Sequence, residues 1–298
     1  MITFENIHFS YGDLNVLNGL NLTIEDNSIF GLVGVNGAGK STLLRILAGI
    51  YETQQGTVTL DNSPTYENES TKQQILYLSD DPYFQFNQTL NDLKDFYSNF
   101  YTLDEATFNK YTMLFKLDPN KRLANFSKGM KRQSFLVLAL SIAPKVLIMD
   151  EAFDGLDPFV RIIFKKALFE LMDEKDITVI ISSHHLKDLE DICDSFGILE
   201  DGKITTSGDI QDSKDSIHKI QVAFKEEIDP STIQGLTIIT STQVARVITM
   251  VTEGKLEDIQ QALAPYHPLL MDVVPINFEE LFIYQMMKRG YQLWTSSI

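Results

Sequence analysis

The hydrophobic and polar residues of this chain follow two different periods, which predict strands and helices in alternation. Apolar residues spaced two apart predict strands within residues 1–28, and residues 56–62 have the same character. Between further apolar runs, apolar residues recur every three or four positions, as they do in helices. This alternation of strands and helices predicts an α/β core with a parallel sheet. The apolar runs, which predict buried strands, are residues 29–33, 75–78, 145–150 and 177–182.

A long helical stretch interrupts the alternation. Apolar and aromatic residues recur at helical spacing between about residues 83 and 144, and Pro144 closes the segment. We expect its aromatic stripes to be buried where helices pack, so the insertion predicts a helical subdomain. The stripes are Leu90, Leu93, Phe96, Tyr97 and Phe100, and Phe108, Tyr111, Leu114 and Phe115.

Two polar stretches predict irregular structure. Residues 63–74 predict a loop, and residues 209–216 predict a linker. Strand and helix patterns resume after the linker, so we expect two domains, residues 1–208 and a small α+β domain over residues 209–298. The predicted elements of the second domain are strands at 220–224, 236–241, 244–251 and 270–274, and helices at 256–263 and 278–289.

A glycine-rich stretch of the form G-x-x-x-x-G-K-[ST] follows the strand at 29–33 and opens a helix. A strand, such a turn and a helix N-terminus together aim backbone N–H groups and the positive end of the helix dipole at one anion. Lys40 would reach the β- and γ-phosphates of a nucleoside triphosphate, and the Ser41 hydroxyl would hold Mg²⁺. The residues expected to contact the nucleotide are Gly34, Asn36, Gly37, Ala38, Gly39, Lys40, Ser41 and Thr42.

Acidic residues and a histidine follow the next two buried strands. Asp150 ends the run at 145–150 and Glu151 follows it directly, and His184 comes shortly after the run at 177–182. Ligands of parallel sheets bind at the carboxyl ends of the strands. We therefore expect Asp150 to hold Mg²⁺, Glu151 to orient and polarise the attacking water, and His184 to contact the γ-phosphate, with His185 in reserve.

With these motifs, residues 1–208 resemble the ATP-binding cassette (ABC) ATPases, the motor subunits of ABC transporters. Members carry a signature, usually L-S-G-G-Q, and this chain has Phe126-Ser127-Lys128-Gly129-Met130 at that place. The resemblance implies a P-loop NTPase cassette with a parallel core sheet, an N-terminal antiparallel β subdomain and a helical subdomain. It also implies that Ser127 and Gly129, at a helix N-terminus, contact the ATP held by an opposite subunit.

Three further positions are carried over from the family. Tyr11 matches the aromatic residue that stacks on adenine, and Asp157 matches the loop that crosses to the other subunit. The third position departs from the pattern, because Asp80 stands where many members have a glutamine that touches Mg²⁺ and couples to the membrane subunit. A carboxylate is able to ligate the metal, so Asp80 joins Ser41 and Asp150 as an expected Mg²⁺ ligand.

Composition narrows the choice of partners. The chain has 25 basic and 41 acidic residues, and its net charge of −16 disfavours nucleic acid and anionic lipid headgroups. The single cysteine, Cys193, rules out an internal disulfide and fits a reducing cytosol. Neither a signal-peptide pattern nor an apolar run of the ~20 residues that span a bilayer is present. We expect a cytoplasmic protein that meets the membrane only through a partner.

The expected function is ATP hydrolysis by the motor subunit of a bacterial ABC transporter. The Ser-Lys-Gly-Met signature and the C-terminal domain resemble those of exporter subunits for peptides or toxic amphiphiles. The chain as a whole is similar to the ATPases of antimicrobial-peptide resistance and phenol-soluble modulin export systems. Such a subunit would bind ATP and Mg²⁺, dimerise head to tail and drive a transmembrane permease at the inner face of the cell membrane. The alternative is a soluble ABC ATPase of the translation or repair type, which a single cassette and the acidic composition disfavour.

Overall fold

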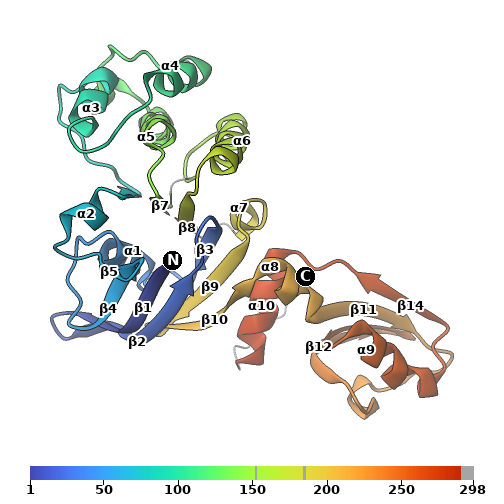
Figure 1. The fold of residues 1–298 in the computed structure, drawn as a ribbon. Helices are drawn as coiled ribbons and strands as arrows, with labels where there is room; N and C mark the ends of the chain where they lie inside the picture. Colours follow the sequence, from blue (N-terminus) through green and yellow to red (C-terminus); the bar gives the residue numbers. More distant parts are fainter. Residues whose placement is uncertain (152, 184–185, 290–298) are drawn as a thin grey trace. The chain divides into compact units, whose positions relative to one another are not determined.

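The chain folds into two compact units, Met1–Ser207 and Gly208–Ile298 (Figure 1). The computed structural model describes residues 1–151, 153–183 and 186–289. Each unit contains a hydrophobic core cluster of its own. Within the described ranges, none of the helices is both long and apolar enough to cross a membrane.

The first unit is built on a six-stranded sheet. In spatial order, its strands are β10 (Lys203–Asp209), β9 (Ser195–Glu200), β3 (Ile29–Val33), β8 (Thr178–Ser182), β7 (Val146–Asp150) and β6 (Ile75–Leu78). The neighbours β9–β3, β3–β8, β8–β7 and β7–β6 pair in parallel. This confirms the predicted parallel core. Strands β3, β7 and β8 are buried along their whole length, which explains their continuous apolar character.

An antiparallel sheet from the N-terminal segment completes the β structure of this unit. Its order is β2 (Leu14–Ile24), β1 (Ile2–Tyr11), β4 (Gln55–Leu60) and β5 (Ser63–Pro64). Strand β1 has a register shift between Phe4 and Ile7, where Asn6 takes a φ of 50°. The core cluster joins residues of both sheets to Leu43, Leu44 and Leu47, the apolar face of the helix that follows β3.

Helices α3 (Leu90–Tyr97), α4 (Glu105–Leu114) and α5 (Lys128–Ile142) gather in one group (Figure 1). Helix α4 packs on α5, and α5 packs on α6 (Pro158–Glu174). The side chains of Thr89, Asp104 and Ser127 accept hydrogen bonds from backbone N–H groups at the starts of α3, α4 and α5. The other helices of the first unit are α1 (Lys40–Leu47), α2 (Glu69–Lys72), η1 (Leu123–Asn125) and α7 (Leu186–Glu190).

The prediction that both aromatic stripes are buried is wrong in part. Leu90 and Leu93 are buried, but Phe96 and Phe100 are 52% and 57% exposed. Their rings contact each other, with centroids 5.4 Å apart. Helix α3 has only eight residues, and its two buried residues both lie in its first turn. In the second stripe only Leu114 is exposed. Periodicity identifies one face of a helix, but it does not show how far along that face a packing partner extends.

The prediction of a loop over residues 63–74 is also wrong, because this stretch contains β5 and α2. The Asn68 side chain accepts a hydrogen bond of 3.3 Å from the Thr71 N–H, and Thr71 is buried. An N-cap and one buried residue stabilise a single helical turn whose sequence is otherwise polar.

The second unit contains a four-stranded antiparallel sheet in the order β12 (Thr237–Val244), β13 (Val247–Glu253), β11 (Ile217–Ala223) and β14 (Leu270–Val274). Ile259 and Leu263 of α9 join Ile220 and Val222 of β11 in the core cluster of this unit. The helices that follow β11 are η2 (Pro230–Thr232), α9 (Leu256–Leu263), η3 (Ala264–Tyr266) and α10 (Phe278–Lys288).

The expected linker at residues 209–216 is instead largely helical, since α8 spans Ile210–Asp215. Asp209 caps it, because its Oδ1 accepts hydrogen bonds from the N–H groups of Gln211 and Asp212 at 2.7 and 3.0 Å. Ile210 is buried. A polar composition therefore concealed a short, well-capped helix with one buried anchor.

Candidate functional site

The glycine-rich loop connects β3 to α1, as its sequence context predicted. Gly39 is the N-cap of α1 with a φ of 105°, and a Cβ atom there would lie 2.9 Å from Val16 Cγ1. A Cβ atom on Gly34 would lie 2.5 Å from the Leu199 carbonyl oxygen. Both positions therefore require glycine. Asn36 and Gly37, at the middle of the loop, are exposed and leave the loop open to a ligand.

Lys40 is held inside this loop. Its side chain is 7% exposed, and its Nζ donates hydrogen bonds to the carbonyl oxygens of Gly34 at 2.7 Å and Val35 at 3.3 Å. Burial lowers the pKa of the ammonium, while the charges of Glu151 and Asp150 oppose this change. The structure thus places Lys40 where the charges of the Asp150 and Glu151 carboxylates act on it.

Asp150, the last residue of β7, is 1% exposed and held by both neighbouring strands. Its Oδ1 accepts a hydrogen bond of 2.6 Å from Ser182 Oγ on β8, and its Oδ2 accepts one of 3.1 Å from Tyr77 OH on β6. Burial, followed by the charge of Asp150, raises the pKa of Tyr77, so the phenol stays protonated and able to donate. Neither Tyr77 nor Ser182 was expected at the site from the sequence. Once β6 and β8 are known to flank β7, their register indicates both.

The donor set at this edge fits Mg²⁺. The described residues contain no group of three or more His, Cys, Asp or Glu side chains that could hold a metal. Mg²⁺ needs no such group, because proteins usually bind it through one or two carboxylates together with substrate phosphates and water. Asp150 supplies a fixed carboxylate, and Ser41, in the first turn of α1, supplies a hydroxyl.

Glu151 follows Asp150 with a φ of 51°, a left-handed conformation that is unfavourable for a residue with a side chain. Its N–H lies 3.1 Å from Ser182 Oγ and 3.2 Å from the Ser182 carbonyl oxygen. The glycine-rich loop, the segment that follows β7 and the start of α5 all contribute to the lining of a cavity of about 520 Å³. Its lining residues are Asn36, Asp80, Asp81, Lys128, Arg132, Glu151 and Asp154.

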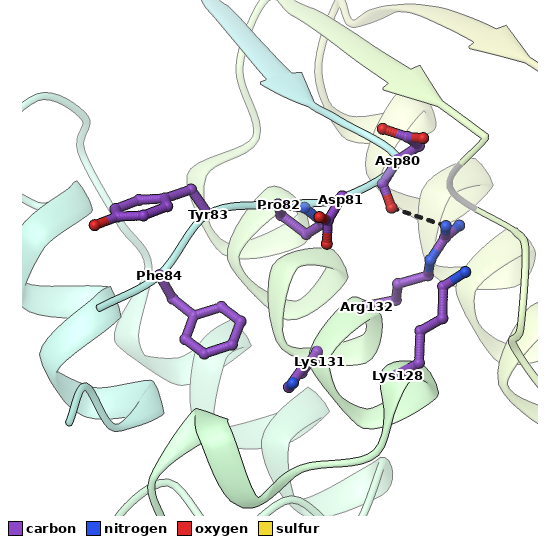
Figure 2. A pocket seen from close by; sticks show the side chains of 8 residues that line it. All are labelled: Asp80, Asp81, Pro82, Tyr83, Phe84, Lys128, Lys131 and Arg132. Atoms are coloured by element: carbon purple, nitrogen blue, oxygen red, sulfur yellow. Dashed lines mark hydrogen bonds between the residues drawn. The ribbon is translucent and has the colours of Figure 1, made fainter. Parts of the chain in front are cut away.

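Asp80 lies on the loop after β6 and is exposed. Its backbone carbonyl oxygen accepts a hydrogen bond of 2.8 Å from Arg132 Nη2, and its carboxylate points away from that guanidinium (Figure 2). The carboxylate is therefore not engaged by Arg132. Asp80 shares the cavity with Glu151, but its expected role as a metal ligand stays a prediction.

Tyr11 ends β1 next to the helix of the glycine-rich loop. Its hydroxyl lies 3.3 Å from Thr42 Oγ1, its ring contacts Phe9 and Tyr51 edge to face, and it is 44% exposed. A supported ring with an open side is suitable for stacking on a base. The Thr42 side chain is buried and engaged with Tyr11, so the backbone N–H is the group that Thr42 has to offer a phosphate.

The signature residues lie at the exposed start of α5. Ser127 is exposed, and its Oγ accepts a hydrogen bond of 3.1 Å from the Met130 N–H. Gly129 lies against the loop that follows Glu151, since a Cβ atom on it would be 2.9 Å from the Gly155 carbonyl oxygen. Asp157 is exposed and caps α6 by accepting a hydrogen bond of 3.0 Å from the Val160 N–H. Lys128, between Ser127 and Gly129, lines the cavity that also contains Glu151.

His184, the expected contact of the γ-phosphate, lies outside the described residues, as does His185. The described chain reaches Ser183, directly after β8. This position is at the same edge of the sheet as Glu151, because β7 and β8 are parallel.

A family model described as ABC transporter matches residues 17–154. The ABC transporter ATP-binding protein YtrB of Bacillus subtilis (strain 168) is 30% identical over 284 residues, which cover 95% of this chain and 97% of YtrB. The lantibiotic transport ATP-binding protein SrtF of Streptococcus pyogenes is 28% identical over 232 residues, 76% of this chain and 97% of SrtF. A solved structure of the ATP binding subunit of an ABC transporter has a TM-score of 0.66 and 27% identity, over 72% of this chain and 92% of that one. The chain belongs to the ABC transporter ATP-binding proteins, the subunits that bind and hydrolyse ATP.

Proposed function

We propose that this chain is the cytoplasmic motor subunit of an exporter for peptides or toxic amphiphiles, and that a separate permease carries the substrate. The observation that carries the proposal is the similarity to a lantibiotic transport ATP-binding protein, which extends over 97% of that relative. The signature variant Ser127-Lys128-Gly129-Met130 also favours an exporter subunit.

The residues at the sheet edge have distinct roles in this proposal. The glycine-rich loop and Lys40 bind the phosphates, and Asp150 and Ser41 hold Mg²⁺. When bound, Mg²⁺ neutralises charge on the β- and γ-phosphate oxygens. Glu151 orients and deprotonates the attacking water. Its left-handed backbone, held by Ser182, and its place in the lining of the cavity support this role.

The nucleotide site is completed by a second copy or a related subunit arranged head to tail. Each chain offers two open half-sites, which supports this arrangement. Asn36 and Gly37 are exposed on the glycine-rich loop, and Ser127 and Asp157 are exposed beside the start of α5. A helix N-terminus with an exposed hydroxyl is suited to bind the γ-phosphate of the ATP held by another subunit.

The exporter role is tested by affinity purification of the tagged chain from detergent-solubilised bacterial membranes. We expect a polytopic membrane protein to co-purify, and we expect cells without the chain to become more sensitive to membrane-active peptides such as lantibiotics. The Glu151→Gln variant is the matched control, because it should assemble with the permease but fail to restore resistance. Recovery with ribosomes and without a membrane protein would contradict the proposal, as would unchanged sensitivity of the deletion strain.

Tyr77→Phe is expected to raise the Mg²⁺ concentration that gives half-maximal ATPase activity by roughly 10- to 100-fold, which is the effect of one lost hydrogen bond to a charged group that ligates a metal. The variant removes only the hydroxyl that donates to Asp150. Tyr101→Phe is the matched control, because the Tyr101 hydroxyl donates to the Ile75 carbonyl oxygen at the opposite end of β6. Equal Mg²⁺ dependence of the two variants would show that Tyr77 does not orient a metal ligand.

A further inference from the structure

Arg132 lies on α5, one turn after the signature residues, and is 6% exposed. Its side chain points from α5 toward the loop that contains Asp80 (Figure 2). It lines the same cavity as Glu151 and Asp154, so it is a buried cation directly behind the edge of the sheet that carries the candidate base.

The guanidinium holds two main-chain carbonyl groups at once. Nη1 donates to the Glu151 carbonyl oxygen, and Nη2 donates to the Asp80 carbonyl oxygen at 2.8 Å. Nε has no hydrogen-bond partner among the described residues. The planar fork of a guanidinium suits two separate acceptors, whereas the ammonium of a lysine is a point charge with no fixed geometry.

The hydrogen bond from Arg132 is made to a residue, Glu151, whose backbone conformation is unfavourable. Glu151 has a φ of 51°, and a non-glycine residue stays in this conformation only where its surroundings hold it. Ser182 accepts from its N–H on one side, and Arg132 and the Asp154 N–H donate to its carbonyl oxygen on the other. The backbone conformation that these bonds hold determines the direction in which the Glu151 side chain leaves the backbone.

We infer that Arg132 is a positioning residue for ATP hydrolysis, because it holds the backbones of Glu151 and Asp80 in place from α5. This inference rests on the proposed role of Glu151 as the base. Arg132 acts through the direction of the Glu151 carboxylate rather than by contact with the nucleotide. Since α5 begins at the signature residues, the helix that would contact one ATP also orients the base for the other.

The test measures ATP turnover of the full chain together with ATP affinity, the latter by calorimetry in EDTA so that ATP is not consumed. Arg132→Gln should lower kcat about 10- to 100-fold, the effect of hydrogen bonds from a charged donor, and change ATP affinity less than 2-fold. Arg132→Lys should recover only part of kcat. Lys131→Gln, on the same turn of α5 but with its Nζ over the Phe84 ring, makes the same charge change and should leave kcat unchanged.

A double-mutant cycle separates positioning from a general effect on structure. If Arg132 acts through Glu151, Arg132→Gln should not reduce further the residual turnover of Glu151→Gln. The inference is overturned if Arg132→Gln has wild-type kcat, or if it reduces turnover by the same factor in both backgrounds. If Arg132→Gln fails to fold, Arg132→Lys in the same cycle decides the question in the same way. Normal turnover of Glu151→Gln by itself would instead overturn the proposed role of Glu151.

Discussion

Glu151→Gln is expected to reduce ATP turnover by roughly 100- to 10,000-fold, the range that general-base catalysis contributes, while ATP binding stays close to wild type. An amide cannot accept the proton of the attacking water, but it has nearly the same size and shape as the carboxylate. The backbone contacts to Ser182 and Arg132 stay available, since they involve only main-chain atoms of Glu151. Phosphate release under saturating ATP and Mg²⁺ measures the effect.

The same variant should accumulate as an ATP-bound dimer, because the nucleotide stays intact between the two subunits. Light scattering coupled to size-exclusion chromatography, with and without ATP, measures the mass. Glu170→Gln, which removes a carboxylate on α6 that lies 3.9 Å from Lys166, is the control and should behave as wild type. Turnover equal to wild type would exclude Glu151 as the base, and a monomer in saturating ATP would contradict the head-to-tail dimer.

Lys40→Ala has the second of the two largest expected effects, a loss of ATP affinity of about 100-fold or more. The ammonium would make hydrogen bonds to two phosphates, and hydrogen bonds to charged groups each contribute about 1.5–3 kcal/mol. At about 1.4 kcal/mol for each factor of ten, two such bonds account for at least 100-fold. Calorimetric titration with ATP measures the loss directly.

The alanine variant also removes a buried aliphatic stem and leaves the carbonyl oxygens of Gly34 and Val35 without the ammonium. Lys40→Met keeps most of the side-chain volume and should lose ATP affinity to a similar extent, which separates the charge from the packing. Lys72→Ala on α2, whose Nζ lies over the Tyr66 ring, is a distant control. Unchanged ATP binding by Lys40→Met would show that the loop does not bind phosphate through this lysine.

Elements with strong local signals could be predicted well from the sequence. The predicted helix at residues 256–263 and the strand at 270–274 coincide with α9 and β14. The strand, glycine-rich turn and helix around Lys40 also lie where the motif placed them. Each of these signals consists of neighbouring residues, whether a hydrophobic period or a glycine that allows a positive φ, so no knowledge of the remaining chain is needed.

Weak or polar signals led to the wrong predictions. Residues 209–216 and 63–74 lack an apolar period, yet caps at Asp209 and Asn68 stabilise α8 and α2 once Ile210 and Thr71 are buried. Burial of one residue is a property of the surrounding fold. For the same reason, the sequence could not distinguish the exposed Phe96 from the buried Phe108.

The sequence alone determined the identity of the chemical groups at the site and the strand ends on which they lie, since a motif and its flanking periodicity are local. Only the tertiary structure decided which side chains support them. Tyr77 and Asp150 are 73 positions apart, and Arg132 reaches Asp80 across 52 positions. These contacts exist because β6 and β8 flank β7 and because α5 packs behind that edge, an order of elements that no stretch of sequence specifies by itself.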